Sequence, residues 1–164
     1  MPAETASTPA GRSKRSRSLR ADVRPRHLFL YGTLMRGEPA HRLLTGRVTF
    51  VDDGTVVGTL LHLGTFPGLV AGRGRVRGEV WRLDAPEVLR TLDEYEGYNF
   101  ERCTIAATLA SGRRVRVLVY RYRGPRTRAP LAARAAERER RSTLHVVEKM
   151  AVIPEGDWRR HRWR

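Results

Sequence analysis

The sequence predicts an α+β domain built around a mostly antiparallel, closed β-sheet. The expected elements follow the order strand, helix, four strands, helix, two strands, which lacks the strand–helix alternation of a doubly wound parallel fold. Apolar and polar residues alternate most clearly over 75–83, as in a half-buried strand. At 164 residues the chain forms one domain with enough length for a substantial core.

The first expected strand, Leu28 to Tyr31, runs directly into a loop. The run is too short for a helix and is rich in bulky apolar side chains. Gly32 ends it, because glycine tolerates the positive φ angles of a sharp exit. A short helix follows, with Pro39 in its first turn and Gly46 as its stop. Backbone N–H groups in such a loop can hold an anion, although an ordinary strand and turn is the more frequent explanation of the loop alone.

The rest of the chain divides into six strands and two helices. We expect strands at 48–52, 55–63, 66–70 (a turn leading into an edge strand), 75–83, 100–109 and 113–122, and helices over 84–97 and 130–141. Asp53-Gly54 is a strong turn dipeptide and separates the first two of these strands. Gly58 indicates a bulge or a close approach. The first helix begins with a capping box of Asp84 and Glu87, and Gly97 ends it.

Cysteine, histidine and apolar content limit the classes of function. Cys103 is the only cysteine, and the five histidines lack the spacing of zinc ligands, so we expect neither a disulfide nor a metal site. No apolar run is long enough to cross a bilayer, and residues 1–26 contain no continuous apolar segment, so we expect no secretory signal peptide. These observations favour a cytoplasmic protein.

The formal net charge of +15 is concentrated at the two ends of the chain. Residues 1–26 carry a net charge of +5, residues 27–120 carry +2 and residues 121–164 carry +8. Such ends are typical of proteins that bind an acidic partner such as nucleic acid. A coding bias explains a chain with 30 Arg and two Lys equally well. Residues 1–25 show no apolar periodicity and are expected to form a disordered basic tail.

Three carboxylates, Asp93, Glu94 and Glu96, gather at the end of the expected helix, where the helix dipole disfavours them. Glu96 follows Leu92 by four residues and therefore shares its inward face. A carboxylate on an apolar face loses hydration, so its pKa rises and it becomes suited to proton transfer near neutral pH. A solvated acidic helix end explains the pattern equally well.

Five short motifs occur in a characteristic order. They are Leu30-Tyr31-Gly32-Thr33-Leu34, Phe66-Pro67, Val76-x-Gly78-Glu79-Val80, Leu92-Asp93-x-x-Glu96-Gly97 and Gly156-Asp157-Trp158. Through them the sequence resembles the γ-glutamylcyclotransferase-like proteins, in particular the branch of γ-glutamylamine cyclotransferase and its bacterial relatives. The resemblance covers about residues 27–122 and resumes at 152–158. It implies a small β-barrel with flanking helices and a reaction that needs neither a metal nor an organic cofactor.

The resemblance also implies roles for individual residues. Tyr31-Gly32-Thr33-Leu34 matches the family's substrate loop, with Thr33 where serine is usual, and its amides would hold the α-carboxylate of a γ-glutamyl group. Glu96 matches the family's catalytic acid/base. Tyr120 resembles the strand tyrosine that lines the pocket, although a core aromatic fits as well. Arg102 matches a position whose role is mainly structural.

The resemblance implies that residues 26–164 form a γ-glutamyl cyclotransferase. The α-amine of a γ-glutamyl amine or peptide would attack its own γ-carbonyl, releasing 5-oxoproline and an amine. An Ala/Arg-rich insertion at about 124–149 departs from the family pattern and leaves the leaving amine open. The alternative is a non-catalytic scaffold that binds nucleic acid or another acidic partner through its basic termini. Nucleic acid is not favoured, because the sequence carries no RNA- or DNA-binding signature.

Overall fold

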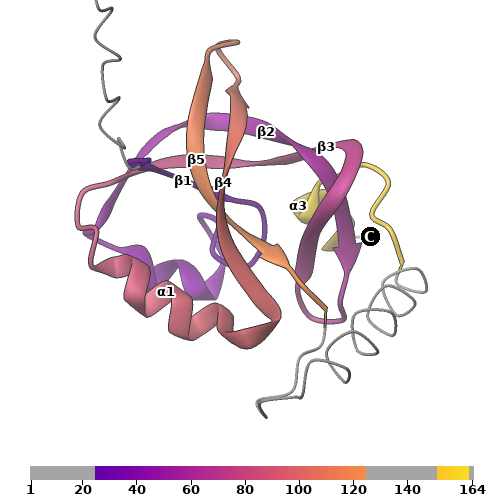
Figure 1. The fold of residues 1–164 in the computed structure, drawn as a ribbon, viewed down its shortest axis with the longest axis horizontal. Coiled ribbons are helices and arrows are strands. Elements are labelled where there is room, and N and C mark those ends of the chain that lie inside the picture. The colour runs from indigo at the N-terminus through magenta and orange to yellow at the C-terminus, as the bar shows by residue number, and fades with distance from the viewer. Residues whose placement is uncertain (1–24, 125–150, 163–164) are drawn as a thin grey trace, which may run out of the picture.

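In a computed structural model, which describes residues 25–124 and 151–162, five strands close into a barrel (Figure 1). The strands are β1 (His27–Leu30), β2 (Val48–His62), β3 (Pro67–Leu83), β4 (Phe100–Leu109) and β5 (Arg114–Tyr122), in the spatial order β1-β3-β2-β4-β5. Neighbouring strands are antiparallel except β1 and β5, which pair in parallel and close the barrel. The predicted α+β class with a closed, mostly antiparallel sheet is therefore confirmed.

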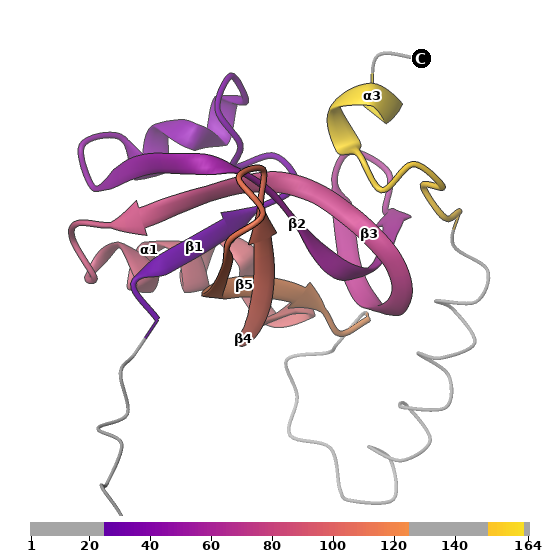
Figure 2. The same ribbon diagram turned by 90° about the horizontal axis from the view of Figure 1, so that it is seen from above.

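Short helices flank the barrel. They are the 3₁₀ helices η1 (Pro39–Leu44) and η2 (Gly97–Asn99) and the α-helices α1 (Val88–Glu96) and α3 (Trp158–Arg162). Figures 1 and 2 show α1 along one side of the barrel and α3 next to β3. No helix among the described residues combines the length and apolar character that a membrane span requires.

The barrel interior is filled by alternate residues of each strand, as the period of two requires. Its buried side chains include Phe29 of β1, Val56 and Leu60 of β2, Val76 and Val80 of β3, Ala107 and Leu109 of β4, and Val117 and Val119 of β5. In α1, Val88 and Leu92 are buried against this core. The spacing of these two residues puts both on one helical face, and Gly97 caps the helix where the sequence predicted its end.

The predicted turn at Asp53-Gly54 is wrong, because β2 passes through it without interruption. Gly54 pairs with Gly78 of β3 on one side and with Leu109 of β4 on the other. A Cβ atom at this position would lie 3.0 Å from the carbonyl oxygen of Thr108. The glycine therefore allows β4 to approach β2 closely. The irregularity expected at Gly58 is present as a register shift between Val57 and Thr59.

Two other boundaries also differ from the prediction. The segments 66–70 and 75–83 belong to one strand, β3, which pairs with β2 along most of its length. The helix α1 begins at Val88, and no side chain caps its N-terminus. The carboxylate of Asp84 instead accepts hydrogen bonds from the Thr49 hydroxyl at 2.5 Å and from Arg82 Nε at 2.8 Å. These partners come from the sheet and displace the local capping box.

The segment 151–162 returns to the barrel and packs on β2 and β3. Ile153 N–H donates to the carbonyl of Leu60 at 2.8 Å, and Arg77 N–H donates to the carbonyl of Gly156 at 2.7 Å. Trp158 is buried. The Gly156-Asp157-Trp158 motif thus joins the end of the described chain to the sheet. The predicted helix over 130–141, the basic tail and nearly all of the insertion lie outside the described residues.

A buried carboxylate, Glu79 of β3, anchors this segment. It accepts hydrogen bonds from Arg36 N–H at 3.0 Å and from Trp81 Nε1 at 2.9 Å, and the guanidinium of Arg159 pairs with it directly. Burial alone would raise the pKa of the Glu79 carboxyl, but these three donors lower it below its ordinary value. The side chain is therefore a charged anchor between β3 and α3.

Removing one donor from this anchor should destabilise the fold. We expect Arg159→Met to lower the free energy of unfolding by about 1.5–3 kcal/mol, because a buried charged acceptor loses a charge-assisted hydrogen bond. Arg160→Met is the matched control, since Arg160 is exposed and its pair with Asp157 is 3.6 Å long. A surface pair of this kind contributes about 0–1 kcal/mol. Urea denaturation measures the free energy of unfolding of both variants. Equal losses in the two would show that Arg159 does not stabilise the fold through the Glu79 carboxylate.

Candidate active site

A single pocket of about 310 Å³ contains every residue that the sequence nominated for the site. Its lining comes from the loop after β1 (Tyr31, Gly32, Thr33, Leu34), the turn before β3 (Thr65, Phe66, Pro67), the end of α1 (Tyr95, Glu96), the start of β4 (Phe100) and the end of β5 (Tyr120), with Phe29 and Leu30 beneath. Segments far apart in the chain therefore meet at one end of the barrel.

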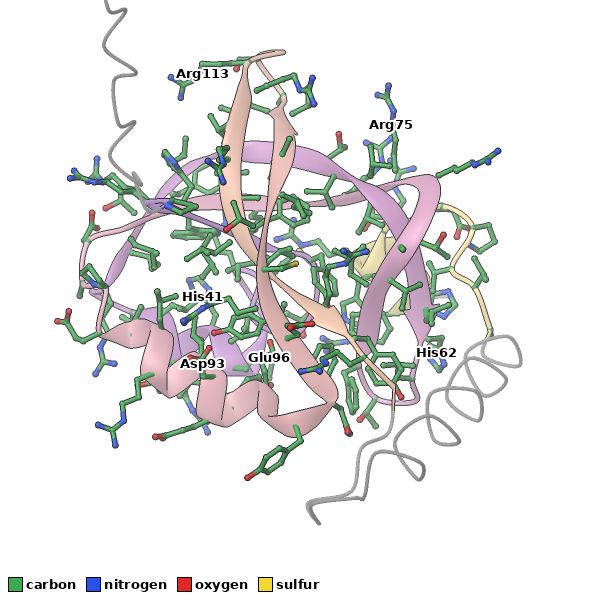
Figure 3. The ribbon with its side chains drawn as sticks, in the orientation of Figure 1. His41, His62, Arg75, Asp93, Glu96 and Arg113 are labelled. Carbon is green, nitrogen blue, oxygen red and sulfur yellow. The ribbon has the colours of Figure 1, made fainter. Side chains whose placement is uncertain are left out.

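Glu96 is the only ionisable carboxylate among the residues that line this pocket. Its side chain is half-buried and accepts no hydrogen bond from any other described residue. Burial raises the pKa of the Glu96 carboxyl from an ordinary value of 4.5 to about 7. Figure 3 shows Glu96 at the C-terminal end of α1, about one turn beyond Asp93. An unpaired carboxyl with this pKa can both accept and donate a proton at neutral pH.

This raised pKa predicts a pH-dependent loss of stability. Between the unfolded value of 4.5 and the folded value of about 7, the folded protein retains a proton that the unfolded chain has released. The contribution of the Glu96 carboxyl to the free energy of unfolding is therefore complete below pH 4.5 and is lost as the pH rises through 7. We expect Glu96→Gln to remove this part of the decline in melting temperature between pH 5 and 8. Identical pH profiles for the two proteins would show that the Glu96 carboxyl titrates normally.

The loop after β1 presents a row of unused backbone donors. Met35 N–H donates to the carbonyl of Gly32 at 3.0 Å and closes a tight turn. The amides of Gly32, Thr33 and Leu34 donate to no atom of the described chain. All three residues line the pocket. Three consecutive free N–H groups beside a pocket are suited to an anion such as a carboxylate.

The reason for glycine at position 32 differs from the one that the sequence suggested. Gly32 is not one of the described glycines whose backbone has a positive φ angle. A Cβ atom there would instead lie 2.7 Å from Cγ of Pro67. Gly32 and Pro67 come from two of the sequence motifs, and both line the pocket. Glycine is required because the turn before β3 packs directly on the loop.

Two hydrogen bonds of the Tyr31 side chain hold the start of the loop in place. Its hydroxyl donates to the carbonyl of Tyr120 at 2.7 Å and accepts from the N–H of Leu69 at 3.2 Å. Burial, followed by the nearby Glu96 carboxylate, raises the pKa of the Tyr31 phenol. With both partners inside the fold, this hydroxyl stays neutral and fixes the position of the loop. Tyr31 also lines the pocket.

Tyr120 holds the helix that carries Glu96. Its hydroxyl donates to Asp93 Oδ1 at 2.6 Å, and Arg102 Nη1 lies 3.1 Å from the same oxygen. Arg102 and Tyr120 are directly opposite each other on β4 and β5, so both reach the same carboxylate. Burial and then the Asp93 carboxylate raise the pKa of the Tyr120 phenol. Asp93 thereby connects α1 to the barrel wall three residues before Glu96.

Loss of the Tyr120 hydroxyl should loosen this connection without removing the aromatic wall. We expect Tyr120→Phe to lower the free energy of unfolding by about 0.5–1.5 kcal/mol, the usual net contribution of one hydrogen bond. Tyr122→Phe is the control, because Tyr122 lies on the same strand and its hydroxyl has no partner among the described residues. Chemical denaturation of the two variants measures the difference. A Tyr122→Phe loss as large as that of Tyr120→Phe would remove the case for an Asp93 connection.

The mouth of the pocket is aromatic. Phe66 and Tyr95 remain exposed by 38% and 46%, which is high for side chains of this size. The rings of Phe66 and Phe100 lie 6.1 Å apart, and the hydroxyls of Thr33 and Tyr95 lie 3.2 Å apart across the opening. Sequence reasoning nominated neither Tyr95 nor Phe100. Their only signal was the pattern of aromatic residues at the helix end, which does not reveal that the rings meet across the barrel end.

Comparisons with known proteins agree with this fold and identify a family. Residues 28–160 match the family model described as "Gamma-glutamyl cyclotransferase, AIG2-like". The chain is 34% identical over 73 residues to a γ-L-glutamyl-butirosin B γ-glutamyl cyclotransferase of Niallia circulans, covering 44% of this chain and 46% of that protein. It is 35% identical over 89 residues to a γ-glutamylaminecyclotransferase of Rattus norvegicus, covering 43% and 54%. The chain thus spans about half the length of the curated relatives that it matches.

Solved structures share the same architecture. An AIG2-like protein of Mus musculus superimposes with a TM-score of 0.53 at 28% identity, over 65% of this chain and 80% of that one. An uncharacterized protein of Pyrococcus horikoshii gives a TM-score of 0.56 at 20% identity, over 84% and 92%. The second likeness concerns the fold alone. The implied barrel with flanking helices is therefore found both in this chain and in its structural neighbours.

Proposed function

This chain belongs to the AIG2-like γ-glutamyl cyclotransferase family, and from that premise we propose that it releases 5-oxoproline and an amine from a γ-glutamyl amine or peptide. The observation that carries the proposal is the pairing of two complementary groups in one pocket. The unpaired Glu96 carboxyl has a pKa of about 7, and three free backbone amides of the loop line the same space.

The loop amides would bind the α-carboxylate of the γ-glutamyl group. This contact fixes one end of the substrate and leaves its α-amine and γ-carbonyl free to fold back on each other. Ring closure is intramolecular, and well-oriented intramolecular reactions reach effective molarities of ~10⁵–10⁸ M. The protein therefore gains most of its rate by selecting the folded-back conformer.

Glu96 would move the proton that the reaction transfers. An α-amine has a pKa of about 7.7–8.0, so it is largely protonated at neutral pH and must lose a proton before it can attack. Glu96 accepts that proton, the new C–N bond forms at the γ-carbonyl, and a tetrahedral oxyanion results. As the oxyanion collapses, the bond to the leaving nitrogen breaks, Glu96 returns the proton to that nitrogen, and the ring nitrogen releases its second proton to solvent. The carboxyl ends the cycle in its starting state.

The aromatic mouth supports an extended leaving group. Phe66, Tyr95 and Phe100 border the opening opposite the loop, where the amine portion of the substrate would leave the pocket. The two relatives are named for γ-glutamyl-butirosin and for γ-glutamylamine substrates. Both names support a substrate in which a γ-glutamyl group is joined to an amine-containing partner.

A substrate screen tests this proposal. The full chain is incubated with a panel of γ-glutamyl amides, comprising alkyl amines, aryl amines, lysine through its side chain and α-amino acids, and 5-oxoproline is measured by mass spectrometry. We expect 5-oxoproline from at least one member, in equal amount to the free amine. No release from any γ-glutamyl compound, by a protein that retains its fold, would refute the activity.

A further inference from the structure

The outer surface of the barrel carries four arginines that have no acidic partner within the described part of the chain. They are Arg75 and Arg77 of β3 and Arg114 and Arg116 of β5, and we refer to them as the arginine face. All four are exposed. Figure 3 shows Arg75 pointing away from the barrel, at the edge opposite the side that holds Glu96 and Asp93. The face is therefore separate from the pocket.

Strand register aligns these side chains across the sheet. Arg77 pairs with Thr55 of β2, Thr55 pairs with Thr108 of β4, and Thr108 pairs with Arg114 of β5. Directly opposite residues point to the same face of a sheet. Measured along the curved sheet, the α-carbons of Arg77 and Arg114 are three strand spacings apart, roughly 14 Å at ~4.8 Å per strand. Arg75 and Arg116 lie in the neighbouring row. Arg75 is two residues from Arg77 along β3, and Arg116 is two residues from Arg114 along β5.

In the described part of the chain no arginine of this face has a carboxylate within ion-pair distance, which is also true of Arg26, Arg42, Arg47, Arg113 and Arg121. Elsewhere in residues 25–124 and 151–162, eight arginines each have a carboxylate oxygen within 3.7 Å: Arg36, Arg82, Arg90, Arg102, Arg123, Arg159, Arg160 and Arg162. One carboxylate, that of Asp53 in β2, lies on the same side of the sheet, two residues before Thr55, and lines the same cleft as Arg75 and Arg77. Two other acids lie at the border. Asp52 accepts a hydrogen bond from Ser111 N–H at 3.1 Å, and Asp157 already pairs with Arg160. The arginines of the face thus outnumber the one carboxylate on their side of the sheet and leave it with a net positive charge.

The residues between the arginines favour one class of partner. Thr55, Ala106 and Thr108 are small, and Val57, which is 70% exposed, is the only large apolar side chain of the face. Protein interfaces depend on buried aromatic or aliphatic anchors, which this face lacks. Single-stranded nucleic acids bind by stacking on aromatic rings, and the face has none. Arginine forks match phosphate oxygens, and a row of them along a convex surface can contact successive phosphates of a duplex backbone.

A shallow cleft extends the surface towards α3. It has a volume of about 380 Å³ and is bordered by Arg75, Arg77 and Arg159, with the two threonines of the row on its floor. Asp53 and Asp157 also line it, on the side next to α3 and the start of the β4–β5 turn. The cleft therefore brings three arginines together with two carboxylates at the border of the arginine face.

We propose that the arginine face binds the phosphate backbone of a nucleic-acid duplex without sequence preference. Each arginine that contacts a phosphate releases condensed counterions, so affinity depends steeply on salt. No side chain of the face is placed to read base edges, and sequence therefore does not matter. Because the face and the pocket lie on different sides of the barrel, the duplex leaves the pocket open. This binding is independent of the proposed catalytic reaction.

The test compares two double variants of the full chain that remove the same charge. The first variant, Arg77→Ser with Arg114→Ser, removes the arginines at both ends of the row. The second, Arg42→Ser with Arg47→Ser, removes two exposed arginines that also lack acidic partners in the described chain. Binding to a short mixed-sequence DNA duplex is followed by fluorescence anisotropy over a range of salt concentrations. We expect the slope of log K against log salt to fall in magnitude by about 2 for the first variant, at about 0.9 per phosphate contact. The second should keep the slope of the unmodified protein.

Three outcomes would overturn the proposal. One is equal behaviour of the two double variants, which would assign the binding to net charge or to the basic ends of the chain. Another is equal affinity for poly-L-glutamate, which would show that any polyanion suffices. The third is no duplex binding by the unmodified chain at low salt. Melting curves confirm that both variants are folded before binding is compared.

Discussion

Replacing Glu96 by glutamine should reduce kcat for 5-oxoproline release by about 10⁴-fold or more. General acid–base catalysis contributes about 10²–10⁴-fold, and here one side chain serves both the deprotonation of the amine and the protonation of the leaving group. Glutamine keeps the shape of the side chain but cannot carry the proton. KM should change little, because the loop amides still hold the carboxylate. Steady-state kinetics at neutral pH measure both parameters.

The control for this variant is Glu94→Gln. Glu94 is exposed and forms a surface pair with Arg90 at 3.4 Å, two residues from Glu96 on the same helix. Its substitution removes the same charge from α1 and should leave kcat within about twofold of the original, as expected for a surface change away from the site. Loss of turnover in Glu94→Gln with activity retained in Glu96→Gln would show that the wrong carboxylate has been assigned to the pocket.

Gly32→Val should abolish turnover by displacing the loop. The new Cβ atom would lie 2.7 Å from Cγ of Pro67, and the two γ-methyl groups of valine leave it no free rotamer to escape. Either the loop or the turn before β3 must move, so the three amides no longer converge on one site. We expect loss of substrate binding as well as turnover, with a melting temperature lowered by several degrees. Isothermal calorimetry with a γ-glutamyl amide measures the binding.

Thr33→Ser is the matched change in the same loop. It keeps the hydroxyl that lies 3.2 Å from the Tyr95 hydroxyl, and it adds no atom. Activity should remain within a few-fold of the original. A Gly32→Val protein that binds and converts substrate normally would exclude the loop as the carboxylate site.

The orientation of Glu96 was predictable because it depends on local spacing. Leu92 and Glu96 are four residues apart, so once Leu92 is buried the carboxylate must share its face. The position of Asp93 was not predictable in the same way. Its partners Arg102 and Tyr120 are opposite each other only in the observed register of β4 and β5, and register is a long-range property.

Glycines gave the least reliable local signals. Asp53-Gly54 has the composition of a tight turn, yet Gly54 lies in the middle of β2, where the approach of β4 requires the absence of a side chain. Gly32 was placed correctly in the loop for a reason that proved wrong, since Pro67 and not a positive φ excludes a side chain. In both cases the deciding neighbour is distant in sequence. Patterns within one segment cannot reveal it.

The identity of the attacking nucleophile tests the proposed reaction most directly. A γ-glutamyl amide accepted by the protein is converted in water enriched in the heavy oxygen isotope, and the products are weighed by mass spectrometry. Attack by the substrate's own α-amine predicts 5-oxoproline without the isotope, together with one equivalent of free amine. Glutamate that carries the heavy oxygen would contradict this account, because it would show that water attacks the γ-carbonyl and that the pocket catalyses hydrolysis.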